Sequence, residues 1–271
     1  MSSHDLPVGW GRRRLLAVLA GLMGFVLLVI AGLTYTVINT LAASDVPAAK
    51  QPVKRDWPVA ADGTRGSGYR DALAAEVMLA AGVDDMKPAA PATETAELMV
   101  IDAPTTSGPA DVPSGFGNTP QGAVGQLAAV EIAVLEPMSI QAARSVYDAW
   151  AMSGASFDQW GLTKSIQAFH QAAGTVDGDS AVSVTATPVG AQIKGTDGPG
   201  WVLACVQLDV TVAVVEQTRF GFGHCERMQW VGDRWMIAPG TPPAQAPSTW
   251  PGSQRSREAG WLQWAETDTV E

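Results

Sequence analysis

The chain has 271 residues, with 17 lysines and arginines against 27 aspartates and glutamates, and a formal net charge of −10. Nucleic-acid-binding proteins usually carry a basic stripe, and none follows residue 14, so the composition argues against direct nucleic-acid binding. Only 16% of the residues are charged, while glycine and proline gather between modules, which indicates one ordered domain on a poorly ordered tether.

The N-terminal region contains a run without a single charge, from Leu15 to Ser44. About 20 apolar helical residues cross a bilayer core, so this run predicts one transmembrane helix over 15–41, in contact with membrane lipid. No second run of this length follows. The alternative is a cleavable signal peptide, whose apolar region spans only about 7–15 residues. The greater length favours a retained anchor.

The basic residues around this run predict its orientation. Three arginines at 12–14 directly precede it, within a tail of residues 1–14, whereas the lysines and arginine between 50 and 55 lie further away and among acidic residues. Because basic residues favour the cytoplasmic side, we expect a cytoplasmic N-terminus and an extracytoplasmic C-terminal domain at the cell membrane.

The segment 42–118 is rich in alanine, proline, glycine and threonine, and it predicts an extended linker. Helix-forming residues interrupt it and predict a short helix over 70–81, followed by Gly82. Such a helix either docks on a partner or on the domain, or stays marginal within the linker, since isolated helices of this length are barely stable.

Three helices are predicted next, over 120–135, 139–150 and 157–173. Thr119–Pro120 is a good helix start, because threonine caps the free N–H groups and proline suits the first turn. The pair Ser156 and Gln159 has the spacing of a capping box for the third helix.

After residue 174 the hydrophobic period changes from 3.6 to 2, which predicts strands. They form an antiparallel meander, so the ordered domain 119–240 is of the α+β class, with helices on one face of a curved sheet. A tail rich in proline and tryptophan follows over 241–271. The predicted strands cover 181–187 with an extension at 192–194, 201–215, 219–231 and 234–238.

The two cysteines fall on the same, more polar face of neighbouring strands, because the apolar residues of 201–215 occupy the even positions and Cys205 an odd one. A turn near Val215 would place Cys205 opposite Cys225 to within a residue or two. Opposed Cα atoms lie about 4.5–5.5 Å apart, which a disulfide can bridge. We therefore predict a cross-strand disulfide, which requires an oxidising compartment. The alternative is two free thiols that face the same way.

Asp209 and Arg227 lie on the same polar face, and we predict a structural ion pair between them. The three histidines, His4, His170 and His224, do not form a catalytic or zinc-binding set with these residues. The sequence therefore predicts no enzyme, no metal and no cofactor. The glycines of GFGFGH lie within a strand and indicate a bulge or a close backbone approach.

Three tryptophans of the tail are candidate interaction residues: Trp250, Trp261 and Trp264. The latter two are three residues apart, so they would share one face of a short helix. Exposed tryptophans of this kind often anchor protein interfaces. The alternative is a tail that folds back on its own domain.

The order of three helices and an antiparallel meander over 119–240 resembles the NTF2-like cone fold. With a single-pass anchor, the outline resembles the VirB8/TcpC-type assembly proteins of bacterial conjugation machines. The stretches GFGNTPQGAVGQLAAVEIAVLEPMS and WVGDRWMIAPG are similar to membrane-anchored actinobacterial proteins of mobile elements. The resemblance rests on element order and contains no signature motif.

This resemblance implies a non-catalytic bitopic scaffold or assembly subunit of a conjugative, type IV-like DNA-transfer channel. Its partners would be other channel subunits and a second copy of the chain, with no direct contact to nucleic acid. Two alternatives have the same outline. One is an extracellular small-ligand-binding or enzymatic NTF2-like domain, and the other is an Mce-associated accessory protein of an actinobacterial lipid importer.

Overall fold

The computed structural model describes residues 56–179 and 181–267, which belong to a single compact unit. The predicted cytoplasmic tail 1–14 and transmembrane helix 15–41 lie outside the described residues. Within the described ranges, no helix has the length and apolar character that a bilayer crossing needs.

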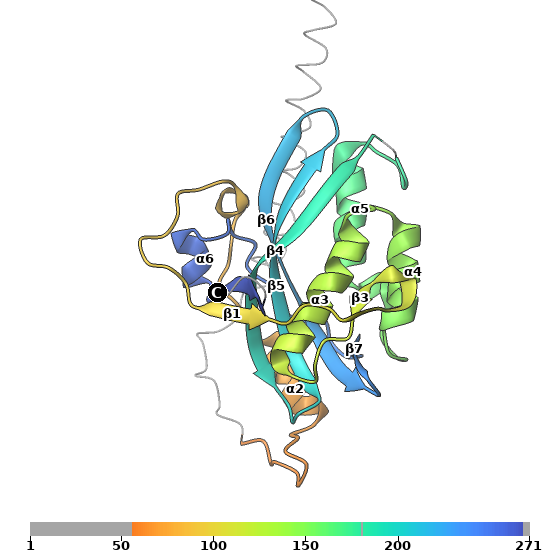
Figure 1. Ribbon diagram of the computed structural model, residues 1–271, viewed down its shortest axis with the longest axis vertical. Coiled ribbons are helices and arrows are strands. Elements are labelled where there is room, and N and C mark those ends of the chain that lie inside the picture. Colours follow the sequence, from red (N-terminus) through yellow and green to blue (C-terminus); the bar gives the residue numbers. More distant parts are fainter. Residues whose placement is uncertain (1–55, 180, 268–271) are drawn as a thin grey trace, which may run out of the picture. The chain divides into compact units, whose positions relative to one another are not determined.

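The centre of the domain is a six-stranded mixed sheet that curls into a half-barrel (Figure 1). Its central neighbours are antiparallel, whereas β1 runs parallel to β8. A separate two-stranded ribbon pairs β2 (Thr106–Ser107) with β3 (Pro113–Ser114). In spatial order the large sheet contains β1 (Leu98–Ile101), β8 (Leu262–Glu266), β4 (Ser183–Thr196), β5 (Trp201–Ala213), β6 (Gln217–Val231) and β7 (Arg234–Ile237).

Three helices cover the concave face of this sheet: α3 (Pro120–Leu135), α4 (Ile140–Trp150) and α5 (Gly161–Ala173). The predicted start of α3 is confirmed, because the N–H of Gly122 donates to Thr119 Oγ1 at 3.0 Å. The shorter helices are α2 (Ser67–Ala75) and α6 (Gln254–Glu258), with 3-10 turns at Val83–Met86, Pro109–Asp111 and Phe157–Gln159.

The capping box predicted at Ser156 and Gln159 is wrong. Ser156 makes no side-chain cap, and residues 157–159 form a 3-10 turn that ends at Trp160 in an extended conformation, with ψ 131°. Both Phe157 and Trp160 are buried against Tyr147, at ring-centroid distances of 5.4 and 4.9 Å. The break at Trp160 lets both rings reach the core, and α5 therefore begins only at Gly161.

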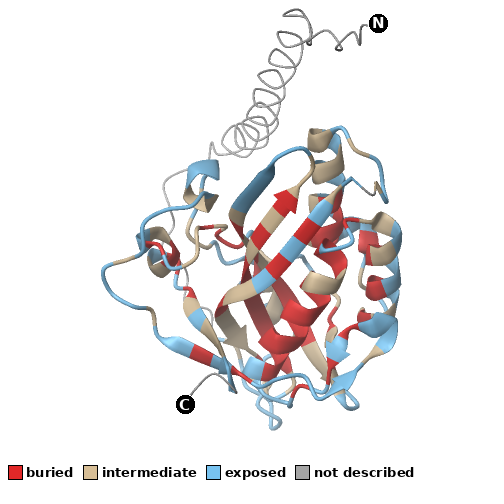
Figure 2. Cartoon of the chain, turned by 45° about the horizontal axis from the view of Figure 1, so that its top comes forward, coloured by how far each residue is buried: buried red, intermediate tan, exposed pale blue. Residues whose placement is uncertain are grey.

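The main core lies between α3 and the concave face of the sheet, where buried residues of both layers face each other (Figure 2). The even positions of β5 point into this core, as the period-2 pattern predicts. Odd positions such as Trp201, Leu203 and Cys205 are also buried, and they belong to two smaller clusters on the opposite face. The central strands are thus covered on both sides.

The predicted linker is wrong for residues 56–118, which form part of the domain. β1 lies beside β8, and Ile101, Val112 and Phe116 are buried in the main core. The predicted short helix exists, but at Ser67–Ala75, where Ala74 is completely buried. Ile101 ends the short apolar run 98–101, whereas Val112 and Phe116 stand alone beside prolines and glycines, so no long hydrophobic period marks this segment as packed.

Candidate functional site

The predicted disulfide joins Cys205 and Cys225. The two residues are directly paired in the β5–β6 ladder, with their Cα atoms 4.0 Å apart. The bridge is buried with Ala246 and Trp261 of the C-terminal tail, and Met78 packs against it. The prediction is confirmed, and the burial indicates a structural crosslink rather than an accessible redox group.

The predicted Asp209–Arg227 ion pair is wrong. Asp209 pairs instead with Arg219, whose Nε donates to Asp209 Oδ1 at 2.7 Å, and Arg227 pairs with Asp71 of α2. The strand register explains the error: Asp209 lies opposite Gly221, six residues from Arg227 along β6. At about 3.3 Å per residue, that distance is far too long for an ion pair.

The tail tryptophans do not share one helix face, because α6 ends at Glu258 and Trp264 lies in β8. Trp261 is buried beside the disulfide, and its Nε1 donates to the carbonyl of Pro247 at 3.1 Å. Trp264 packs against the main core on the other side of the sheet, and Trp250 lies beneath the guanidinium of Arg219 at 5.0 Å. The tail therefore folds back on its own domain.

The glycines of GFGFGH allow this tail to lie directly on β6. A Cβ added at Gly221 would lie 1.9 Å from the carbonyl oxygen of Thr249, and one at Gly223 would lie 2.6 Å from that of Pro247. The N–H of Gly223 donates to Ser248 Oγ at 3.0 Å. The predicted close backbone approach is confirmed, and its partner is the tail.

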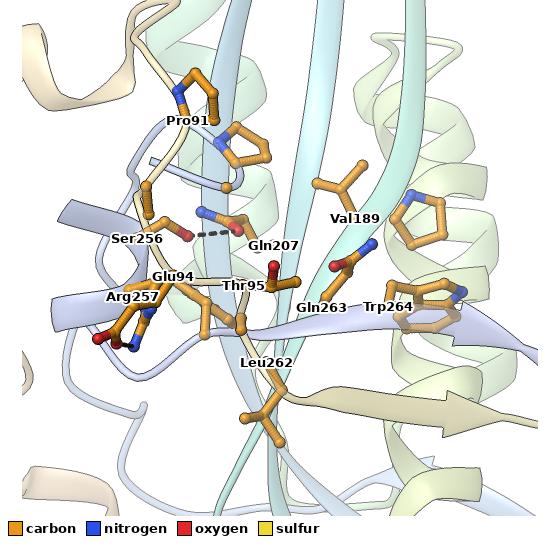
Figure 3. Close-up of a pocket in the computed structure, with 16 residues that line it drawn as sticks. Pro91, Glu94, Thr95, Val189, Gln207, Ser256, Arg257, Leu262, Gln263 and Trp264 are labelled. Atoms are coloured by element: carbon orange, nitrogen blue, oxygen red, sulfur yellow. Dashed lines mark hydrogen bonds and ion pairs between the residues drawn. The ribbon is translucent and has the colours of Figure 1, made fainter. Parts of the chain in front are cut away.

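A pocket of about 420 Å³ opens where β4 and β8 diverge, and we call it the β4–β8 pocket (Figure 3). Three segments that are distant in the sequence meet there: residues 91–96, the middle of β4 and the tail from 251 to 264. The ladder between β4 and β5 shifts its register between Pro188 and Gly190, which leaves Val189 as an extra residue at the pocket wall.

Gln207 of β5 and Ser256 of α6 lie on one side of this pocket, with Val189 and Trp264 on the other (Figure 3). The Gln207 amide is fixed, because it donates to the carbonyl of Thr249 at 2.8 Å and accepts from Ser256 Oγ at 3.1 Å.

An ion pair between Arg257 and Glu94, at 2.9 Å, connects the tail to the 91–96 segment beside the pocket. The lining is a mixture of apolar, amide and backbone groups, and such a lining suits a segment of polypeptide.

A second polar site lies inside the concave face. Glu131, in the C-terminal half of α3, is completely buried, and neither of its carboxylate oxygens has a hydrogen-bond partner among the described residues. Burial raises the pKa of this carboxyl well above its ordinary value, and the charge of Glu226 on β6 raises it further.

Glu226 has polar partners. Trp160 Nε1 donates to its Oε2 at 3.0 Å, and the backbone N–H of Arg227 donates to its Oε1 at 3.0 Å. His224 Nε2 lies 3.6 Å from the same carboxylate without forming a hydrogen bond. Burial, and then the charge of Glu226, raises the pKa of Tyr147 to about 12. Tyr147 therefore stays neutral at neutral pH.

Sequence reasoning missed both glutamates and the β4–β8 pocket. The signal for Glu131 was present, since it is a single acidic residue within the apolar run LAAVEIAVL. His224 is partly buried beside Phe222, whereas Asp209 is on the opposite face and takes no part in this cluster. In the part of the chain that the structure describes, no three His, Cys, Asp or Glu side chains are placed to hold a metal ion.

The comparisons with known proteins do not extend this picture. No protein-family model, no curated protein and no solved structure matches the chain.

Proposed function

We propose that the chain is a non-catalytic, single-pass membrane scaffold of a conjugative, type IV-like transfer channel, and that it binds another subunit through the β4–β8 pocket. The observation that carries the proposal is the construction of this pocket. The tail and the 91–96 segment join the sheet edge to form a mixed polar and apolar recess of about 420 Å³. That volume is in the range of ligand sites that are mostly formed in advance.

The arrangement of α3, α4 and α5 on the concave side of β4–β7 supports an NTF2-like cone over 119–240. In this proposal the segment 56–118 and the tail are additions that extend the cone, because they supply β1 and β8 at one end of the sheet. They also supply most of the residues of the β4–β8 pocket. The segment 56–118 and the tail would thus distinguish this scaffold from an NTF2-like domain without such extensions.

The Cys205–Cys225 disulfide supports an extracytoplasmic position for the domain, since structural disulfides persist in oxidising compartments. The anchor predicted over 15–41 would hold the domain close to the bilayer. The residues 42–55 between the anchor and the described domain can span at most about 50 Å, at roughly 3.5 Å per residue. The partner should therefore present its own binding segment near the membrane surface.

The proposal is tested by a photo-crosslinking residue at position 263, which is exposed within the pocket, in full-length chain in native membranes. The matched control is position 233, an equally exposed residue in the β6–β7 turn. We expect adducts with channel subunits from position 263 only. Equal labelling from both positions, or adducts only with proteins outside such a channel, would contradict the proposal. Lipid-uptake proteins among the adducts would favour the importer alternative.

A second candidate function is a small-ligand-binding or enzymatic domain. One observation favours it: His224 Nε2 and Glu226 Oε2 lie 3.6 Å apart on the concave face, and their side chains are 13% and 9% exposed. A thermal-shift screen of the full-length chain against small organic acids and amines tests this candidate. Stabilising compounds whose effect disappears in Glu226→Gln would support it, and a screen without any stabilising compound would reject it.

A further inference from the structure

Glu131 is an anomaly in the packing of α3. Buried carboxyl groups in proteins are normally hydrogen-bonded or paired with a cation, because an isolated buried charge is costly. Glu131 is 0% exposed and has neither kind of partner within the described residues. Its neighbours along the helix, Val130 and Val134, are core residues. An ionised side chain at this position would oppose the packing of α3 on the sheet.

The neighbouring carboxylate makes ionisation still less favourable. Glu226 accepts hydrogen bonds from Trp160 and from the backbone of Arg227, both of which stabilise its negative charge. Two carboxylates that share an interior site cannot both ionise without a large repulsion. The proton therefore stays on Glu131.

The other ionisable groups on the elements packed against α3 are engaged away from Glu131. On α4 the Arg144 guanidinium lies over Phe157 at 3.6 Å, and Tyr147 stays neutral. On β6 His224 lies near Glu226. Asp148 of α4 is exposed to solvent. The remaining groups have these contacts: Lys164 with Gln159, His170 with Met138 and Thr175, Lys194 with the carbonyls of Ala74 and Glu76, Asp209 with Arg219, Arg227 with Asp71, and Arg234 with the Trp150 ring.

We propose that Glu131 is a proton-binding site that holds α3 on the sheet, so that the domain folds with one proton bound here and loses the packing of α3 when that proton leaves. The ligand of the site is the proton itself. The inference does not depend on the proposed channel function, because it concerns the stability of the concave face alone. It makes the domain sensitive to alkaline conditions on its side of the membrane.

The sign of the effect follows from proton linkage. In the unfolded chain Glu131 has an ordinary pKa of about 4.3 and is ionised at neutral pH, whereas the folded state keeps the proton. The folded state therefore binds one more proton, and the contribution of Glu131 to the free energy of unfolding is fully present below pH about 4.3. This contribution decreases as the pH rises toward the raised pKa of the folded state. Across this window the equilibrium constant for unfolding increases about tenfold per pH unit from this group alone.

The test is denaturant unfolding of the full-length chain in detergent, followed by tryptophan fluorescence across the window from pH 5 to pH 8. Glu131→Gln removes the titrating proton but keeps the shape, and Glu131→Leu keeps an apolar side chain if the glutamine is poorly tolerated. The matched control is Glu216→Gln, at the exposed β5–β6 turn. We expect the equilibrium constant for unfolding of the wild type to increase about tenfold more per pH unit than that of either Glu131 variant. The control Glu216→Gln should keep the pH dependence of the wild type.

Infrared spectroscopy gives a second measurement on the same samples. The wild type at neutral pH should show the C=O stretch of a protonated carboxyl group, and this band should disappear in Glu131→Gln. The band should persist in Glu216→Gln. Equal pH slopes in the wild type and both Glu131 variants, or a wild-type spectrum without this band, would overturn the inference.

Discussion

Cys205 and Cys225 face each other directly across β5 and β6, and the bond between them lies beneath the C-terminal tail. The crosslink closes a hairpin loop, with a sequence separation of 20. It therefore restricts the unfolded chain and fixes the register of the two longest-paired strands at the same time.

The double substitution Cys205→Ala and Cys225→Ala should lower the free energy of unfolding by about 2–4 kcal/mol, because the unfolded chain regains the entropy of the open loop. Urea unfolding of the full-length chain in detergent measures the difference. Reduction of the wild type should give a similar loss, and two free thiols in non-reducing mass spectrometry of the native protein would contradict the prediction.

Asp197 should hold the start of the domain in place. Its buried carboxylate accepts from the backbone N–H groups of Arg65 and Gly66, and Arg70 Nε donates to it at 2.6 Å. Asp197→Ala removes these charge-assisted hydrogen bonds, each worth about 1.5–3 kcal/mol at most. We expect trypsin to cleave after Arg65 and Arg70 much faster than in the wild type.

The matched control is Asp233→Ala, in the exposed turn between β6 and β7, which should leave this cleavage unchanged. If Asp197→Ala were cleaved at the wild-type rate, another contact would have to hold this segment on the sheet.

The two aspartate–arginine pairs should differ in their contribution to stability. Arg227 is almost completely buried and loses its carboxylate partner in Asp71→Asn, which should cost about 1–3 kcal/mol, since a buried guanidinium loses the charge that neutralises it. Asp209→Asn breaks the pair with the half-exposed Arg219 and should leave the unfolding midpoint within experimental error. Denaturant unfolding curves of the two variants, recorded in parallel, measure the two losses of unfolding free energy. A larger loss in Asp209→Asn than in Asp71→Asn would contradict the prediction.

The tail requires glycine at position 221. Gly221→Ala places a methyl group against the Thr249 carbonyl, so the segment around Thr249 must move away from β6. We expect a loss of about 1–3 kcal/mol, typical of overpacking, together with a red-shifted Trp261 emission as the tail loosens. Gly117→Ala is the control, because its added Cβ meets no atom within 4 Å. Equal stability of the two variants would show that the tail adapts without cost.

The sequence was sufficient for the elements whose signals are local. Thr119 and Ser139 mark the helix starts, the alternation along 201–213 assigns the two faces of β5, and the numbers of the two cysteines predict their pairing. Each of these features depends on residues close together in the sequence: a helix-capping residue, the alternation of apolar residues along one strand, or one turn between two strands.

The long-range features could not be predicted in the same way. β1 pairs with β8 across more than 160 residues, and its four consecutive apolar residues do not show the alternation that marks a half-buried strand. The ion pair of Asp71 with Arg227 also joins distant segments, so a prediction limited to neighbouring strands assigned Arg227 the wrong partner. The β4–β8 pocket exists only after these segments meet.

Affinity purification of the full-length chain from native membranes tests the scaffold proposal most directly. The comparison uses the wild type and Thr95→Trp, which fills the β4–β8 pocket from an exposed position. We predict that membrane ATPase and channel subunits of a transfer system co-purify with the wild type and are lost from the variant. Recovery of the chain without such subunits, or equal recovery of them with both proteins, would contradict the account.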